Sequence, residues 1–194
     1  MITREQALSL ISEHVTNKNI VKHMLATEAL MVGVYDELSK RGEDLGGSRE
    51  EWAMTGLLHD GDYTESVPVE KQGIQIADWA KEKGYGVPDN VTHAMASHNR
   101  ENTKIEPENL MDWTIFIGDS LTGLIVASTL VLPDKKLSLL TPETIMKRFR
   151  EKSFAKGTRR EDLMLSNEKL GISLEKLVEV SLRSMQAISG ELGL

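Results

Sequence analysis

Histidine and aspartate are the residues of this chain that could hold a metal ion. Its five histidines all lie within the first 98 of its 194 residues: His14, His23, His59, His93 and His98. Imidazole nitrogen and carboxylate oxygen together suit Mn, Fe, Co, Ni, Mg or Zn, and the spacing does not choose among these ions. The chain contains no cysteine, which excludes disulfides, thiolate nucleophiles and cysteine-type zinc sites.

Two of the histidines stand in apolar contexts. His23 falls on the apolar stripe of an expected helix, and the pair His59-Asp60 directly follows the apolar residues 56–58. Taken alone, a histidine is more often a surface or hydrogen-bonded core residue than a ligand, and a His-Asp pair arises easily by chance. The context, rather than the dipeptide, marks these three residues as candidates for a shared site.

Asp119 is the fourth candidate, because it lies within the most apolar stretch of the chain. Burying an ionised carboxylate is costly unless it is paired or coordinates a metal ion. No Lys or Arg occurs between Lys104 and Lys135, so the neighbouring sequence offers Asp119 no cation. A divalent ion shared with the three residues above would supply that charge and leave coordination positions open for water. The alternative is a core polar network that holds three helices together without a metal ion.

The elements that would position these residues are helical throughout. Helix-start signals occur at Thr3, Asn19, Ser48 and Thr141, two of them as capping boxes. The expected helices span about 3–15, 19–42, 48–58, 68–83, 88–98 and 108–132, one from 141 onward, then 159–170 and 174–190. The sequence therefore predicts an all-α, compact bundle that forms a single domain over residues 1–194. Its core lies in about 19–132, with the C-terminal helices of 141–192 packed on it.

Charge and hydropathy exclude some partners. Lys and Arg number 23 against 30 Asp and Glu, a formal net charge of −7, so we expect neither a nucleic-acid polymer nor a membrane as partner. The apolar stretch 115–132 contains Asp119, which would cost about 2.5–3.5 kcal/mol at the centre of a bilayer. We interpret this stretch as a buried helix. No secretory signal pattern is visible, and the expected location is cytoplasmic.

These residues and their flanking segments resemble the HD superfamily of metal-dependent phosphohydrolases. The pattern is His23, then His59-Asp60 in Leu-Leu-His-Asp-Gly-Asp-Tyr, then Asp119 in Gly-Asp-Ser-Leu-Thr-Gly-Leu. Small stand-alone bacterial and archaeal HD proteins share these segments. They also share the Ser-His-Asn of residues 97–99 and the Phe-Ala-x-Gly-x-x-Arg turn of residues 154–160. The similarity spans about residues 20–162.

The resemblance implies a helical bundle of the HD type around one divalent metal ion held by His23, His59, Asp60 and Asp119. Such an ion would polarise a phosphoryl oxygen and lower the pKa of a water molecule. Asp60 and His59 would be the catalytic residues, with Asp60 helping to accept the proton of that water. The implied activity is hydrolysis of a phosphate ester of a small molecule, such as a nucleotide.

Five further residues are expected at the substrate or at a second metal ion: His98, Arg100, Gln72, Arg159 and Arg160. The arginines would meet the charge of the phosphate, and His98 is placed to bind the phosphate or a second ion. The chain departs from the family pattern at Gln72, where relatives often carry His before Gly. Because an amide binds a divalent ion more weakly than imidazole does, the sequence argues against a second metal ion.

Three other acid or histidine positions are interpreted from their spacing. His93 lies five residues before His98, which separates the two by about 140° around a helix. We therefore expect His93 to be structural and His98 to line the site. Asp62 and Glu65, in the loop after the His-Asp pair, either support the site or act as its base, or else belong to a solvated turn.

The segment from Lys135 to Arg160 concentrates nine basic residues against two acidic ones. It is interpreted either as a solvated face that balances an acidic body or as a phosphate-attracting rim beside the site. Besides the hydrolase, two functions remain open: a non-catalytic metal- or nucleotide-binding regulatory module with the same fold, and a purely structural scaffold. The last helix could serve the core or the face of a homo-oligomer.

Overall fold

Every regular element of the computed structural model, which describes residues 1–194, is a helix. The longer helices are α1 (Arg4–His14), α2 (Lys18–Leu38), α3 (Arg49–Leu58), α4 (Gln75–Glu82), α5 (Asp89–His98), α7 (Leu110–Leu130), α8 (Pro142–Arg150) and α11 (Leu174–Ala187). The short ones are α6 (Arg100–Thr103), α9 (Arg160–Leu163), α10 (Ser166–Leu170), α12 (Ser189–Leu192) and the 3-10 turns η1 (Ser39–Arg41), η2 (Val69–Lys71) and η3 (Leu137–Leu139). The prediction of an all-α, single-domain chain is confirmed.

Local sequence signals explain several helix starts. Thr3 and Ser48 each form a capping box, in which the cap and the residue three positions later exchange hydrogen bonds. Thr141 caps α8, and Pro142 occupies its first position, where no N–H is needed. These starts were predicted correctly because they depend only on neighbours in the chain.

Three boundaries differ from the expectation. Asn17, not Asn19, caps α2: its side-chain oxygen accepts a hydrogen bond of 2.9 Å from the Asn19 N–H. The helix expected over 68–83 is interrupted at Gly73, whose φ of 88° is outside the helical region, so η2 and α4 replace it. The helix expected over 159–170 is divided into α9 and α10.

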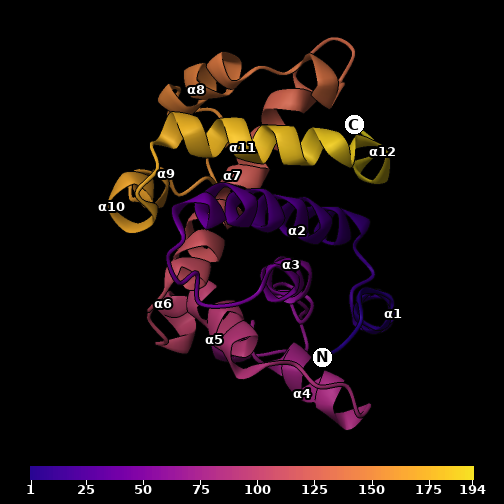
Figure 1. Cartoon of the computed structure of the whole chain (residues 1–194). Coiled ribbons are helices and arrows are strands. Elements are labelled where there is room, and N and C mark those ends of the chain that lie inside the picture. Colours follow the sequence, from indigo (N-terminus) through magenta and orange to yellow (C-terminus); the bar gives the residue numbers. More distant parts are fainter.

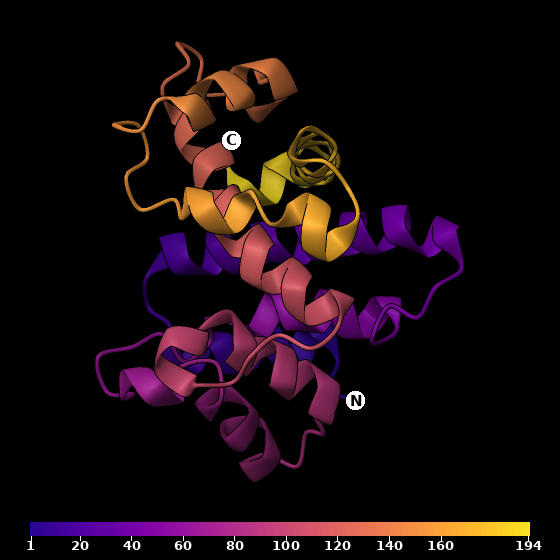
Figure 2. The same cartoon turned by 90° about the vertical axis from the view of Figure 1, so that its left-hand side faces the viewer.

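Helix α2 is at the centre of the bundle. It packs on α3 along one side and on α11 along the other (Figure 1). Helix α7 crosses α2, and the view turned by 90° shows it running from the end of the molecule that holds α5 and α6 to the end that holds α8 (Figure 2). The apolar face of α11 is buried in this packing, so the last long helix serves the core.

The interior consists of two groups of buried apolar side chains. The larger lies around α7 and α11, and the smaller lies among α1, α4 and the beginning of α2. Helices α2, α3 and α5 contribute to both groups; on α2, for example, Met24 belongs to the smaller and Leu30 to the larger. The candidate ligands are carried by α2, α5 and α7 and by the end of α3, so they lie where the two groups meet.

Helix α7 is the one helix long and apolar enough, by length and composition alone, to cross a membrane. In this structure 61% of its most apolar window is buried inside the protein. Packing against α2, α5 and α8 therefore accounts for its composition, in agreement with the interpretation as a buried helix.

Candidate metal centre

Residues from four helices meet at one point of the bundle. His23 comes from the second turn of α2, the pair His59-Asp60 from the end of α3, His98 from the end of α5 and Asp119 from the middle of α7. The possible ligand atoms of His23, His59 and Asp60 all lie within 4.8 Å of one another, so this group could hold a metal ion. The structure thus brings these side chains close together.

Asp119 lies next to both imidazoles of this group, those of His23 and His59. Its Oδ1 lies 2.9 Å from Nε2 of His23 and 3.9 Å from Nε2 of His59. Asp60 Oδ2 is 3.6 Å from Nε2 of each of these rings, and its Oδ1 is 3.5 Å from Nε2 of His98. Most of these separations are too long for hydrogen bonds but short enough for a shared cation between the donors.

The second nitrogen of each ring makes a contact that fixes its orientation. Nδ1 of His59 lies 2.9 Å from the carbonyl oxygen of Gly56, and Nδ1 of His98 bonds the carbonyl of Met95. Carbonyls only accept, so both Nδ1 atoms carry a proton, which in the neutral ring leaves a lone pair on Nε2. Such outward hydrogen bonds are typical of histidines that ligate metals.

The orientation of His23 follows from a threonine one turn after Asp119. While the Thr122 hydroxyl donates to the Asp119 carbonyl at 2.8 Å, its oxygen can accept from Nδ1 of His23, which lies 3.0 Å away. In this arrangement Nδ1 of His23 carries a proton and its Nε2 is directed into the group. All three imidazoles are arranged in the same way, with Nδ1 bonded outside the group and Nε2 inside it.

The two facing Nε2 atoms of His23 and His59 need a proton or a metal ion between them. Nε2 of His23 and Nε2 of His59 are only 3.1 Å apart, a repulsive arrangement unless one carries a proton or both bind a cation. Burial lowers the pKa of His23, but the hydrogen bond and charge of Asp119, with the charge of Asp60, outweigh burial and raise it above its usual value. In the metal-free site a proton on His23 thus separates the two Nε2 atoms. A divalent ion fits the same place.

The electrostatics of the remaining members also favour a cation. Burial lowers the pKa of His59 to about 4, so this ring is neutral near pH 7 and able to ligate. Burial alone would raise the pKa of Asp119, yet the hydrogen bond and charge of His23 and the other imidazoles hold it far below its usual range. The pKa of Asp60 is likewise lowered, by His59 and His98 against burial. Both carboxylates are therefore ionised.

Asp119 also has a cation from the protein, contrary to the expectation from its neighbouring sequence. Nη2 of Arg159 lies 3.2 Å from Asp119 Oδ2, and Nε of Arg159 lies 2.8 Å from Asp162. This arginine comes from the loop before α9, 40 positions away in the sequence. Beside the pair is an open cavity of about 210 Å³, whose lining has no hydrophobic residue: His23, Asp119, Ser120, Gly123, Gly157, Thr158 and Arg159.

Arg160 does not face the group, although the sequence placed it with the phosphate-binding residues. Its guanidinium donates to the carbonyl oxygens of Phe149, Glu151, Phe154 and Ala155, at distances between 2.6 and 3.4 Å. The arginine thereby fills the inside of the turn that the sequence identified at 154–160. Its role is to hold the loop that presents Arg159.

Arg100 and Gln72 lie at the edge of the region. Arg100 forms an ion pair with Glu106 at 2.9 Å, and its guanidinium lies 4.4 Å from the centre of the Phe116 ring. The Gln72 amide lies 3.4 Å from the carbonyl of Val67, and its side chain lines a separate cavity. Neither side chain contacts the four central ligand candidates. His98, in contrast, is nearly buried and contacts Asp60 directly.

Asp62 and His93 take structural positions, whereas Glu65 is exposed. His93 pairs with the buried Asp112 at 2.9 Å, which links α5 to α7 away from the group. Asp62 is buried and not part of a solvated turn: its two oxygens accept hydrogen bonds from the N–H groups of Gly73 and Ile76. Asp62 thus fixes the loop between the His-Asp pair and α4.

Sequence reasoning missed the residues that orient the rings. Thr122 and the carbonyl of Gly56 were not identified, although Thr122 lies within a segment that carries the family resemblance and Gly56 directly precedes another. The position of Thr122, three residues after Asp119 on the same helix face, is the signal that could have identified it.

Comparison of the chain with protein-family models, with curated proteins and with solved structures finds no match.

Proposed function

We propose that this protein is a metal-dependent phosphohydrolase of the HD type, which hydrolyses a phosphate ester of a small molecule. The observation that carries the proposal is the set of three imidazole Nε2 atoms and two ionised carboxylates directed at one point, beside a polar cavity with an arginine. The resemblance of the segments around His23, His59-Asp60 and Asp119 to HD proteins supports the same conclusion.

In this proposal the residues that hold the ion are His23, His59, Asp60 and Asp119, with His98 alongside. A bound divalent ion would supply positive charge to a phosphoryl oxygen and to the attacking water. Asp60 is the candidate general base, because both of its oxygens face the group and its carboxylate is ionised near pH 7. His59 is fully buried, and its role in this proposal is to keep its Nε2 in position as a ligand of the ion.

The phosphate is bound, in the same proposal, in the 210 Å³ cavity beside Asp119. Arg159 supplies a planar pair of donors that suits phosphate oxygens, and the hydroxyls of Ser120 and Thr158 can donate as well. The Arg160 turn keeps Arg159 at this position. Arg159 would then divide its charge between the substrate and Asp119.

The test combines metal analysis with phosphate release. Purified protein is loaded in turn with Mn, Fe, Co, Ni, Mg and Zn, its bound metal is measured, and phosphate release is followed over a panel of phosphomonoesters. We expect Asp60→Ala to lower both metal content and activity at least tenfold. Asp36→Ala, which removes an exposed acid paired with Arg49 on the far part of α2, is the matched control. Unchanged activity in Asp60→Ala would contradict the proposal.

The second candidate is a non-catalytic module that binds a metal ion or a nucleotide. It is favoured by Gln72, which stands where HD relatives often carry a histidine and whose amide contacts a carbonyl of its own loop. A nucleotide that raises the melting temperature of the metal-loaded protein, yet remains intact after long incubation, would favour this module over the hydrolase.

A further inference from the structure

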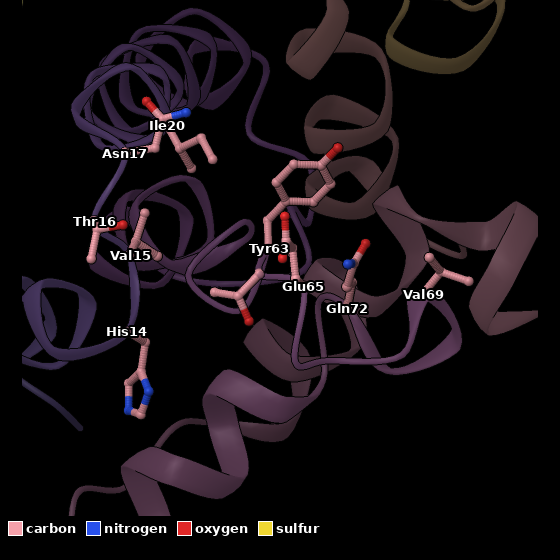
Figure 3. Close-up of a pocket in the computed structure, with 10 residues that line it drawn as sticks. His14, Val15, Thr16, Asn17, Ile20, Tyr63, Glu65, Val69 and Gln72 are labelled. Atoms are coloured by element: carbon pink, nitrogen blue, oxygen red, sulfur yellow. The ribbon is translucent and has the colours of Figure 1, made fainter.

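A second cavity, of about 510 Å³, lies between the start of α2 and the loop that follows the His-Asp pair (Figure 3). Its volume is within the usual range for small-molecule sites. Tyr63, Glu65, Val69 and Gln72 line it from the loop, and the segment from His14 to Ile20 lines it from the other side. The hydrolysis proposed above assigns no role to this cavity.

Three features of the lining place the cavity next to the metal-binding group. The Tyr63 N–H donates to the Asp60 carbonyl at 3.0 Å, so the tyrosine lies one turn from a candidate ligand. Ile20 precedes His23 by three positions and shares its face of α2. Gln72 precedes Gly73, whose backbone approaches His98 so closely that a Cβ there would lie 3.2 Å from the ring. Three segments that line the cavity therefore also carry or closely approach residues of the group.

The charges of the two cavities differ. The smaller one, beside Asp119, contains Arg159. The larger one is lined by no Lys or Arg, and its one carboxylate is that of Glu65. An anion is therefore favoured beside Arg159 and disfavoured beside Glu65. A phosphate ester that spans the group would place its phosphate in the first cavity and the remainder of the molecule in the second.

We infer that the 510 Å³ cavity receives the leaving group of the substrate, and that this leaving group is an uncharged alcohol that carries a flat ring. The inference rests on the proposed hydrolase function. Tyr63 is 53% exposed and its ring offers a stacking face, while the side-chain amides of Asn17 and Gln72 offer donors and acceptors to a polar ring edge. Nucleoside monophosphates fit this class, and substrates with a second phosphate on the alcohol do not.

The stacking part of the inference is tested with two phosphomonoesters, adenosine 5′-monophosphate and the ring-free glycerol 1-phosphate. In Tyr63→Ala we expect KM for the ring-bearing ester to rise about tenfold, with kcat within about twofold, because stacking on an aromatic ring contributes at this level. KM for glycerol 1-phosphate should stay unchanged. Tyr63→Phe, which keeps the ring, should restore the KM of the ring-bearing ester.

The charge part is tested with adenosine 3′,5′-bisphosphate, whose leaving group carries an extra phosphate. The wild-type protein should prefer the monophosphate in kcat/KM. Glu65→Lys should reduce that preference about tenfold, because it replaces a repulsive charge by an attractive one in the cavity. Glu82→Lys makes the same change of net charge at the end of α4, outside the cavity lining, and should leave the preference as it is.

The outcomes separate this inference from the function on which it rests. If the metal-loaded wild-type protein releases phosphate from no ester of the panel, the hydrolase proposal fails. If it hydrolyses both monoesters, while Tyr63→Ala leaves the ratio of their KM values unchanged and Glu65→Lys leaves the charge preference unchanged, the hydrolase stands. In that case the assignment of the leaving-group cavity is overturned.

Discussion

The buried imidazole of His59 should make the metal-free protein sensitive to acid. Burial lowers the pKa of this ring to about 4 in the folded protein, chiefly by desolvation, whereas in the unfolded chain it titrates near 6.5. As the pH falls below 6.5, the unfolded chain takes up the proton and the folded protein does not. The stability that His59 contributes is therefore present above pH 6.5 and is lost as the pH falls toward 4.

The size of the effect follows from the two pKa values. At 1.36 kcal/mol per pH unit, the difference between 6.5 and about 4 corresponds to a loss of about 3 kcal/mol once the pH is below both. About 2.5 kcal/mol of this falls between pH 7 and pH 4.5. His59→Asn removes the titration while keeping a side-chain N–H that can donate to the Gly56 carbonyl, and so provides the comparison.

The assay is urea unfolding of chelator-treated protein at pH 7 and pH 4.5, followed by circular dichroism. Wild-type protein should lose about 2.5 kcal/mol more unfolding free energy between the two conditions than His59→Asn does. His23 and His98 have raised pKa values and shift stability in the opposite direction, but they do so in both proteins and cancel in the comparison. Equal losses in the two proteins would refute the reasoning.

Three further substitutions test the packing around the site. Gly56→Ala places a Cβ 2.7 Å from backbone atoms of α2, and this overpacking should lower the free energy of urea unfolding by about 2–3 kcal/mol. The control Gly123→Ala has open space around its Cβ and should be neutral or stabilising by up to about 1 kcal/mol. Asp62→Asn leaves one of two buried N–H groups without an acceptor and should lower the unfolding free energy by about 1–3 kcal/mol. An unchanged urea midpoint would show that the loop does not depend on both hydrogen bonds. Arg160→Lys cannot donate to four carbonyls at once, so loop 151–159 should be cleaved faster in limited proteolysis, while cleavage in the exposed control Arg150→Lys should be unchanged.

Much of the helical framework could be predicted because its signals are local. The capping boxes at Thr3 and Ser48 depend on residues three positions apart, and the apolar periodicity of α2 and α7 depends on one helix at a time. The break at Gly73 depends on a partner 11 positions away, since Asp62 accepts the Gly73 N–H and a neighbouring one. No pattern within the 68–83 segment contains that information.

The candidate site divides in the same way. His23, His59, Asp60 and Asp119 could be identified because their residue types and flanking segments match a family pattern. The pairing of Arg159 with Asp119 could not, because it depends on how the loop before α9 folds back over α7. The inverse error concerns Arg160: a basic residue beside a site was expected to face it, but the carbonyls of its own loop were closer acceptors.

The meeting of two packing groups at the candidate ligands has a consequence for how the protein would respond to occupancy. Helices α2, α3 and α5 belong to both groups, and α7 belongs to the larger alone. A ligand held by side chains from all of these helices would link the two groups, so that neither group could unfold locally without releasing the ligand. Amide exchange would then slow together in α1, which belongs to the smaller group, and in α11, which belongs to the larger.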